Sequence, residues 1–408
     1  MRRQAEARDA ADPLAPFRAR FLRPDRDVVY LDGNSLGPPS GEVLDAVLAT
    51  IRRDWRTRLV EAWSEWIDLP LRAGGLLAPL LGADPAEVAL ADQTTVNLYK
   101  LATAALEVTD GRDVVTDADN FPSDRYVLDA AARRAGGRLR IVPSDPSPDD
   151  VAAALDGEVG LVSLSWVSYR SGALADAAAI TAAAHDVGAL VLWDCSHAAG
   201  VVPVDLDGIG ADLAVGCTYK YLNGGPGAPA FLYVRADLHE RLVSPIPGWW
   251  GHASMFSFAP DYVPAPDIRR FLVGTPPILS LVAAIAGIEL VAEAGIEAIR
   301  RKSMAMTGWF VELVETHLGD LGARVVGPRD PSRRGSHVAV AHPEAWQLTQ
   351  ALRDEGVIVD FRTPELVRFG FSPLVNSFAD LARAIETTES ILRDGRHRRH
   401  PRQPTTVT

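Results

Sequence analysis

Between residues 85 and 235, short apolar runs alternate with longer stretches that have helical spacing. The runs are rich in β-branched and aromatic residues and are expected to form strands: VVT (114–116), LRIV (139–142), LVSLSWV (161–167), LVLWD (190–194), LAVGC (213–217) and FLYV (231–234). This strand–helix–strand alternation predicts a parallel sheet covered by helices on both faces. Turn residues, rather than a helix, join the last two runs, so that edge of the sheet is expected to be mixed.

After about residue 280 the pattern changes to that of a smaller α+β unit. In chain order it predicts two long helices (278–294 and 296–318), the strand SHVAVAH, the helix AWQLTQALRDEG, the strands VIVDF and LVRFGF, and a final helix over 377–394. Such a mixture is typical of a unit with its own sheet.

The length of the chain also indicates two domains, because 408 residues are too many for one hydrophobic core. The strand VVYLD (28–32) has no partner near it in sequence and is expected to pack with the C-terminal unit. We therefore expect an α/β fold with a large domain over 50–285 and a smaller α+β domain formed by 1–49 with 286–408. The tail over about 395–408 is expected to be disordered.

Composition narrows the class of protein. With 47% hydrophobic and 23% charged residues, the chain is an ordinary globular protein. Its formal net charge of −12 argues against broad nucleic-acid binding, which needs a basic face. The N-terminus lacks the apolar core of a secretory signal, and the most apolar stretch (278–288) is too short to span a bilayer. We expect a cytoplasmic protein with neither a membrane nor a nucleic-acid partner.

The two cysteines, Cys195 and Cys217, belong to the predicted buried strand segments, and neither has CxxC spacing. Neither a disulfide framework nor a metal site is therefore expected.

Residues 190–225 carry the side chains with the clearest chemical meaning. Asp194 and His197 follow the run LVLW, and Lys220 follows the next run and precedes a Gly-rich turn. Open α/β sheets bind ligands at the carboxyl ends of their strands. Pyridoxal phosphate requires a carboxylate that keeps its pyridine nitrogen protonated and a lysine that forms a Schiff base with its aldehyde. The combination predicts this cofactor.

Each of these residues alone has a plainer interpretation. Lys220 can be a lysine at a strand end, and Asp194 can be a helix N-cap. The pairing of the two favours the cofactor. For His197, a hydrogen-bonded core histidine and a cofactor contact are equally compatible with the sequence.

A second group of candidates lies earlier in the chain. Thr94 and Thr95 begin a strong helix, whose free N–H groups suit a phosphate, although ordinary capping explains threonines there too. Phe121 lies in a turn with Asp124 three residues later. Its ring can stack on a cofactor or form the hydrophobic staple of the next helix.

A third group lies towards the C-terminus. The Gly- and Pro-rich loops GWWGH (248–252) and VGTPPIL (273–279) are of the kind that faces a cleft or a subunit contact. Arg368 stands in an apolar run. It can be an exposed residue of an edge strand or a bidentate clamp on a substrate carboxylate.

Several segments, in this order, resemble the kynureninase family: YLDGNSLGPP (30–39), TTVNLY (94–99), DNFPSDRY (119–126), D-x-S-H (194–197), TYKYLNGGPG (218–227), GWWGH, GTPPIL and VRFGFSPLVNSF (367–378). The resemblance implies fold type I of the pyridoxal phosphate enzymes, with a mostly parallel seven-stranded sheet, and a homodimer. It also implies hydrolysis of L-kynurenine to anthranilate and L-alanine, or of the 3-hydroxylated substrate to 3-hydroxyanthranilate. The corresponding pathway is tryptophan catabolism through kynurenine, which leads to NAD biosynthesis.

The resemblance also implies residue roles. Lys220 holds the cofactor as a Schiff base and then removes the substrate α-proton, and Asp194 binds the ring nitrogen. Tyr219 reaches the cofactor phosphate and also the reacting centre, where it transfers protons. Further cofactor contacts are implied at Thr94, Thr95, Phe121, Asp124, Ser165, His197, Trp249 and Thr275, of which the last two close the phosphate site across the dimer. Substrate contacts are implied at Asn34, Ser35, Trp66, His252 and Arg368, the last on the substrate carboxylate.

Other readings of the same cofactor site are a cysteine desulfurase or selenocysteine lyase, an aminotransferase, and a non-catalytic homologue. The first uses a cysteine late in the chain, and no cysteine follows Cys217. An aminotransferase would consume an α-keto acid, and a non-catalytic homologue would be colourless and unmodified by borohydride. The sequence leaves the choice between kynurenine and its 3-hydroxy derivative open, because that choice depends on pocket geometry.

Overall fold

The computed structural model describes residues 1–22, 24 and 27–402. The chain divides into two compact units. We call them the large unit, formed by Glu42–Tyr169 with Ala175–Leu290, and the small unit, formed by Met1–Gly41 with Arg170–Leu174 and Val291–Thr408.

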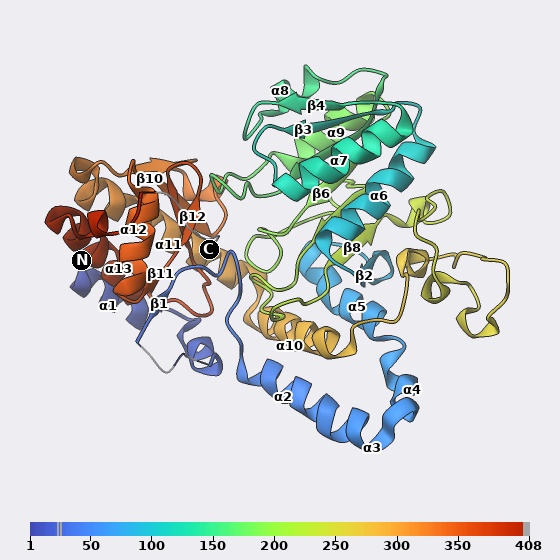
Figure 1. The fold of residues 1–408 in the computed structure, drawn as a ribbon, viewed down its shortest axis with the longest axis horizontal. Helices are drawn as coiled ribbons and strands as arrows, with labels where there is room; N and C mark the ends of the chain where they lie inside the picture. The colour runs from blue at the N-terminus through green and yellow to red at the C-terminus, as the bar shows by residue number, and fades with distance from the viewer. Residues whose placement is uncertain (23, 25–26, 403–408) are drawn as a thin grey trace. The chain divides into compact units, whose positions relative to one another are not determined.

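A seven-stranded sheet forms the centre of the large unit (Figure 1). In the order β2-β8-β7-β6-β5-β3-β4, its strands are β2 (Val88–Leu90), β8 (Phe231–Val234), β7 (Leu213–Gly216), β6 (Leu190–Asp194), β5 (Val159–Ser165), β3 (Asp113–Asp117) and β4 (Leu139–Val142). Neighbours from β4 to β7 are parallel, whereas β8 is antiparallel to both β7 and β2. The predicted parallel sheet with one mixed edge is confirmed; only the three-residue β2 was not predicted.

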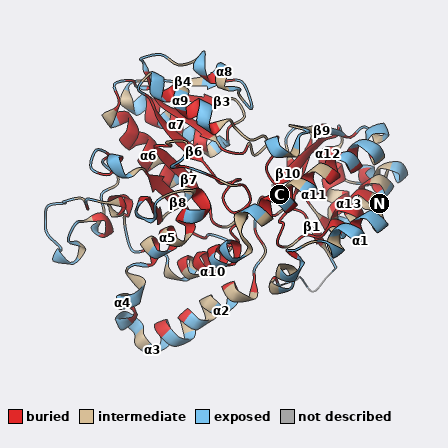
Figure 2. Ribbon diagram, turned by 180° about the vertical axis from the view of Figure 1, so that it is seen from behind, coloured by how far each residue is buried: buried red, intermediate tan, exposed pale blue. Residues whose placement is uncertain are grey.

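Four helices connect strands of this sheet: α6 (Thr94–Val108), α7 (Pro122–Ala135), α8 (Pro148–Ala152) and α9 (Ala177–Asp186). Before β2 come α2 (Gly41–Ala49), α3 (Arg56–Arg58), α4 (Trp63–Trp66) and α5 (Leu69–Leu81), and α10 (Ile278–Ala294) follows β8. Leu98 and Leu101 of α6 and Leu128 of α7 share one buried core with Leu161 of β5 and Leu192 of β6. Apart from the edge strand β4 and the last residue of β5, the strands are buried, and Figure 2 shows buried residues in red. Their burial explains why they consist of continuous apolar runs rather than alternating ones.

The chain between β8 and α10 contains only single turns of helix and extends away from the sheet as loops (yellow in Figure 1). At its base Arg270, in the turn η8 (Ile268–Phe271), is buried and donates to the carbonyl groups of Ala265 (2.8 Å) and Leu242 (3.1 Å). Phe256 and Phe258 of the same segment are exposed. This segment therefore combines a buried arginine that binds its backbone with exposed aromatic rings.

The small unit contains a four-stranded antiparallel sheet and a separate parallel strand pair. The sheet, in the order β12-β13-β10-β9, consists of β12 (Asp360–Arg362), β13 (Leu366–Gly370), β10 (His337–Ala341) and β9 (Arg324–Val326); the pair is β1 (Val29–Tyr30) with β11 (Val357–Ile358). Its helices are α1 (Arg2–Ala10), α11 (Ile296–His317), α12 (Ala345–Asp354) and α13 (Phe378–Asp394). The expected pairing of the N-terminal strand with C-terminal residues is therefore observed.

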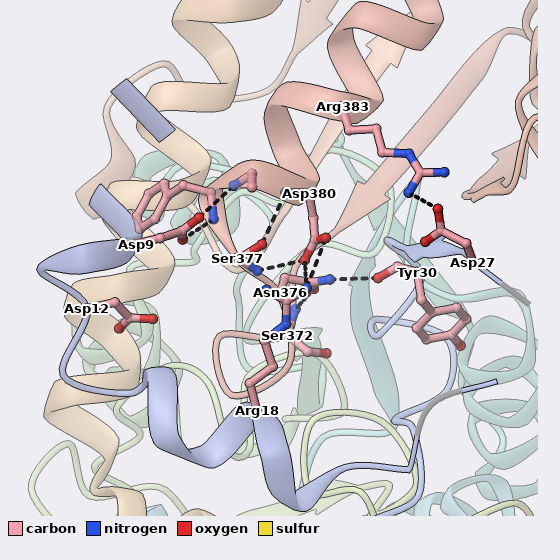
Figure 3. A network of polar contacts seen from close by, with 12 residues as sticks. Asp9, Asp12, Arg18, Asp27, Tyr30, Ser372, Asn376, Ser377, Asp380 and Arg383 are labelled. Atoms are coloured by element: carbon pink, nitrogen blue, oxygen red, sulfur yellow. Dashed lines mark hydrogen bonds and ion pairs between the residues drawn. The ribbon is translucent and has the colours of Figure 1, made fainter. Parts of the chain in front are cut away.

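Polar contacts also join the two ends of the chain in the small unit (Figure 3). Helix α13 begins with a capping box between Ser377 and Asp380. The carboxylate of Asp9 accepts the N–H groups of residues 378 and 379 at 2.7 and 3.0 Å, and Arg18 forms an ion pair with Asp380 at 3.0 Å. The first helix turn of α13 is thus completed by the N-terminal segment.

The expectation of a disordered tail is wrong for residues 395–402. Arg396–Arg399 forms a 3-10 turn, and His397 is buried with its Nε2 2.8 Å from Glu344 Oε2. The side chain of Gln347 donates to the carbonyl of His400 at 2.6 Å. The basic composition of the tail predicted a solvated terminus. The tail instead binds Glu344, the residue before α12, and the tail sequence alone does not reveal this acidic partner. Residues 403–408 lie outside the described residues.

Among the described residues, no single helix is both long and apolar enough to cross a membrane; α10 and α11 would meet these criteria only as a pair, with an 80° bend between them.

Candidate active site

A cavity of about 250 Å³ lies in the large unit where strands of the parallel sheet end. Nine predicted residues line it: Thr94, Thr95, Phe121, Asp124, Ser165, Asp194, His197, Tyr219 and Lys220. Strand register explains part of this convergence, because Ser165 and Asp194 are the last residues of β5 and β6 and stand opposite each other. Parallel strands bring their carboxyl ends to one edge of the sheet, where ligands bind.

Asp194 and Asp124 form a pair of neighbouring acids in this cavity. Burial, followed by the charge of Asp194, raises the pKa of Asp124 well above its ordinary value, and Lys220 opposes this only in part. The ionised form of Asp124 is therefore disfavoured beside Asp194. Oδ1 of Asp194 accepts the N–H of Ser196 at 2.8 Å. The Asp124 side chain is buried, and its hydrogen bond with the Asp194 side chain also raises its pKa.

Lys220 and Tyr219 bring an amine and a phenol to the same cavity. Nζ of Lys220 lies 3.0 Å from Nε2 of His197 and 5.9 Å from the centre of the Tyr219 ring. The neighbouring Cys217 thiol, burial and the charge of Asp194 all raise the pKa of Tyr219. The phenol is consequently protonated at neutral pH and can donate a proton.

The first turn of α6 borders the cavity. The helix begins after Gln93, whose side chain makes no capping hydrogen bond. Gln93, Thr94 and Thr95 all line the cavity, so the positive end of a 15-residue helix is next to it. Backbone N–H groups in this position are suited to an anion such as a phosphate.

These features match the three functional groups of pyridoxal phosphate. The cavity offers an amine for an aldehyde, a pair of neighbouring carboxyl groups for a pyridine nitrogen, and a helix N-terminus for a phosphate. Two buried acids and an amine gathered beside a helix N-terminus form a set of polar groups suited to a ligand rather than to the protein alone. The residues present fit the cofactor that the sequence predicts.

Comparison with known proteins agrees with this geometry. A family model described as the kynureninase C-terminal domain matches residues 299–388. A kynureninase from Pseudomonas fluorescens is 42% identical over 395 residues, which is 95% of this chain and 94% of the relative. Another from Deinococcus radiodurans is 43% identical over 397 residues, with 95% and 96% covered. The chain belongs to the kynureninase family. The resemblance found in the sequence and its cofactor, pyridoxal phosphate, are thereby confirmed.

Solved structures support the fold of this kynureninase-family chain. The apo cysteine desulfurase from Thermococcus onnurineus NA1 superposes with a TM-score of 0.79 at 19% identity, covering 90% of this chain and 95% of that one. A cysteine desulfurase from Escherichia coli gives the same TM-score and identity, with 93% and 98% covered. At this identity the likeness concerns the fold alone, which is the predicted fold type I.

Four predicted residues of the large unit do not line the cavity. Trp66 ends α4 and contacts Trp63 edge-on, with 5.6 Å between ring centres. His252 follows Trp249 in the loop between β8 and α10, and its Nδ1 accepts the N–H of Ser254 at 2.8 Å. Thr275 is exposed just before α10. The family roles of these residues remain predictions.

The other predicted substrate contacts lie in the small unit. Arg368 is buried in β13, between β12 and β10, so the alternative of an exposed edge-strand residue is wrong. It forms an ion pair with Asp360, whose carboxylate also accepts the Ser35 hydroxyl at 3.2 Å. Asn34 is buried, and its side chain lies so close to Gly370 that a Cβ atom added there would clash with it.

Sequence reasoning missed two polar residues that contact predicted site residues. Asn120 accepts the Ser165 hydroxyl at 3.0 Å and thereby fixes a cavity residue. Asp360 binds Arg368 across the β12–β13 register, in which the two stand opposite each other. A charged residue inside the apolar run VIVDF was the available signal for Asp360, because burial of a lone carboxylate is costly.

Proposed function

We propose that this protein hydrolyses the Cβ–Cγ bond of L-kynurenine or 3-hydroxy-L-kynurenine, releasing anthranilate or 3-hydroxyanthranilate and L-alanine. The observation that carries the proposal is the single cavity lined by both the Lys220 amine and the Asp194 carboxylate. The family of the chain supports the choice of reaction.

Lys220 holds pyridoxal phosphate through its amine, Asp194 binds the ring nitrogen, and Thr94 and Thr95 lie at the phosphate. Phe121, Asp124, Ser165 and His197 complete the pocket. When bound, the cofactor supplies an electron sink for the charge that develops at the substrate α-carbon. Burial and the neighbouring Asp194 raise the pKa of Asp124, which disfavours a second negative charge beside the ring nitrogen.

Two residues move protons. The amine of Lys220, once released by the substrate amine, removes the proton from the substrate α-carbon. Water adds to the γ-carbonyl, and collapse of that hydrate breaks the Cβ–Cγ bond. The Tyr219 phenol, which its surroundings keep protonated, donates a proton to the β-carbon and takes one from the hydrate.

Arg368 binds the substrate carboxylate as a planar fork, with Asn34, Ser35, Trp66 and His252 as further substrate contacts. The large domain over 50–285 binds the cofactor, and the smaller domain of 1–49 with 286–408 supplies Arg368. These assignments rest on family positions and on the ion pair that orients Arg368.

The protein acts as a cytoplasmic homodimer in which Trp249 and Thr275 complete the partner's phosphate site. The exposed aromatic loop supports this assignment: side chains of Trp249, Phe256 and Phe258 lie with ring centres 6.3–6.5 Å apart. Phe258 is 75% exposed, and clustered exposed aromatic rings mark protein contact surfaces.

Borohydride trapping tests the cofactor linkage. The chain has lysines only at positions 100, 220 and 302, so a reduced pyridoxyl group can be located by peptide mass spectrometry. We expect the label on Lys220, and turnover of both substrates measured by fluorescent aromatic product and by alanine. Consumption of an α-keto acid without anthranilate would favour an aminotransferase. Protein that stays colourless and unlabelled with pyridoxal phosphate would refute the proposal.

A further inference from the structure

Lys100 is a buried lysine outside the predicted machinery. Its side chain is 0% exposed on α6, and Nζ donates to Asp92 Oδ2 and to the Phe271 carbonyl, both at 2.7 Å. Removing an ammonium from water costs several kcal/mol unless partners compensate. Only three of the 41 basic residues of the chain are lysines, and Lys100 is one of them.

One partner of Lys100, Asp92, belongs to the segment that leads into the cavity, and the other belongs to the turn η8. Asp92 has a left-handed backbone (φ 48°) and directly precedes Gln93, Thr94 and Thr95, which line the cavity. Its carbonyl accepts the N–H of another lining residue, Ala230, at 2.9 Å. The second partner, Phe271, ends η8 four residues before Thr275.

Charge gives this contact a consequence for ligand binding. Asp92 is partly exposed and stands two residues before the first turn of α6, where a bare carboxylate would repel a phosphate dianion. The Lys100 ammonium neutralises that carboxylate from the buried side while fixing the turn. Burial lowers the pKa of Lys100, and the Asp92 charge opposes that shift.

We propose that Lys100 is a positioning residue for the cofactor phosphate: it neutralises Asp92 and holds the turn that presents the N-terminus of α6. The proposal rests on the proposed function, because it takes this helix end as the phosphate site. It goes beyond that function in assigning selectivity for the phosphorylated cofactor to a residue that does not line the cavity.

The test compares pyridoxal phosphate with pyridoxal, which has the same aldehyde and ring but no phosphate. Full-length protein freed of cofactor is titrated with each compound, and the visible absorbance of the Lys220 linkage gives two dissociation constants. The selectivity ratio is the dissociation constant for pyridoxal divided by that for pyridoxal phosphate. It measures selectivity for the phosphate and is insensitive to a general loss of stability. We expect K100Q, which keeps hydrogen-bond donors but loses the charge, to lower the ratio about tenfold.

Substitution of Asp92, the ion-pair partner of Lys100, gives a prediction of opposite sign. D92N removes the negative charge and leaves the Lys100 ammonium in place, and asparagine is compatible with a left-handed backbone. The selectivity ratio of D92N is therefore expected to equal or exceed that of the wild type. K302Q is the matched control, because Lys302 is also buried and bound to an aspartate (Asp12, 2.6 Å) but lies in the small unit. Its ratio should be unchanged.

A ratio for K100Q within twofold of the wild type would overturn the proposal, and so would an equal fall in K100Q and D92N, which a merely structural ion pair predicts. Should K100Q not fold, D92N decides alone: a tenfold fall refutes the proposal, and an unchanged or higher ratio supports it. Wild-type protein that binds neither compound would instead refute the proposed function.

Discussion

Asp117 offers a quantitative test of the electrostatics at the end of β3. Its side chain is buried, and Oδ1 accepts the N–H of Asp119 at 2.8 Å. Burial, with Asp145 adding to it, raises the pKa of Asp117 to about 6 from an ordinary value of 3.8. The folded protein thus binds this proton more tightly than the unfolded chain, so the group costs folding almost nothing well below pH 4 and disfavours folding increasingly as the pH rises from about 4 to 6.

The size of the effect follows from the two pKa values. Linkage gives a cost to folding of roughly 1.6 kcal/mol at pH 5 and roughly 3 kcal/mol at pH 8. D117N retains the acceptor for the Asp119 N–H and cannot ionise. The burial of its amide adds a cost that is independent of pH, so it cancels in the comparison of the two pH values. Between pH 5 and pH 8, the wild type should therefore lose about 1.4 kcal/mol of unfolding free energy relative to D117N.

Urea unfolding of cofactor-free protein, followed by circular dichroism and tryptophan fluorescence, measures this difference. The exposed aspartate at position 110 supplies the control variant, D110N, which should follow the wild type at both pH values. If D117N and the wild type change in parallel between pH 5 and pH 8, the pKa of Asp117 is not raised and the reasoning fails.

Three further predictions concern the site. K220A should show neither the visible absorbance of the cofactor linkage nor turnover, as measured by spectroscopy and product fluorescence; retention of both would exclude Lys220. Y219F should still form the visible Schiff-base absorbance with Lys220 but lower kcat by about 10²–10⁴, because a proton donor is lost, and an unchanged kcat would assign the proton transfer elsewhere. R368K should raise KM about tenfold with a smaller effect on kcat, since a point charge replaces a planar fork, and unchanged steady-state constants would remove Arg368 from the substrate site.

Local patterns were sufficient to predict most of the sheet and part of the site. The strands β5, β6 and β7 are apolar runs long enough to be recognised, and Asp194 and Lys220 follow two of them, so their chemistry could be predicted from neighbouring residues. The strands β2 and β9 have three residues each, too few to show a period.

What the sequence could not reveal depends on contacts between distant segments. The raised pKa of Asp124 follows from its burial beside Asp194, 70 positions later in the chain. The ordered tail depends in the same way on Glu344, which lies more than 50 positions before its partner His397. Such pairings are set by tertiary packing, about which periodicity carries no information.

The cap that Asp9 supplies to α13, together with the pairing of β1 and β11, has a consequence for biosynthesis. The N-terminal segment is synthesised first, yet the residues against which it packs, in β11 and α13, are synthesised much later. Residues 42–290 contain nearly all of the larger sheet's contacts and can collapse during translation. Residues 1–41 lack these partners until α13 has been synthesised, so the smaller core is completed later than the larger one.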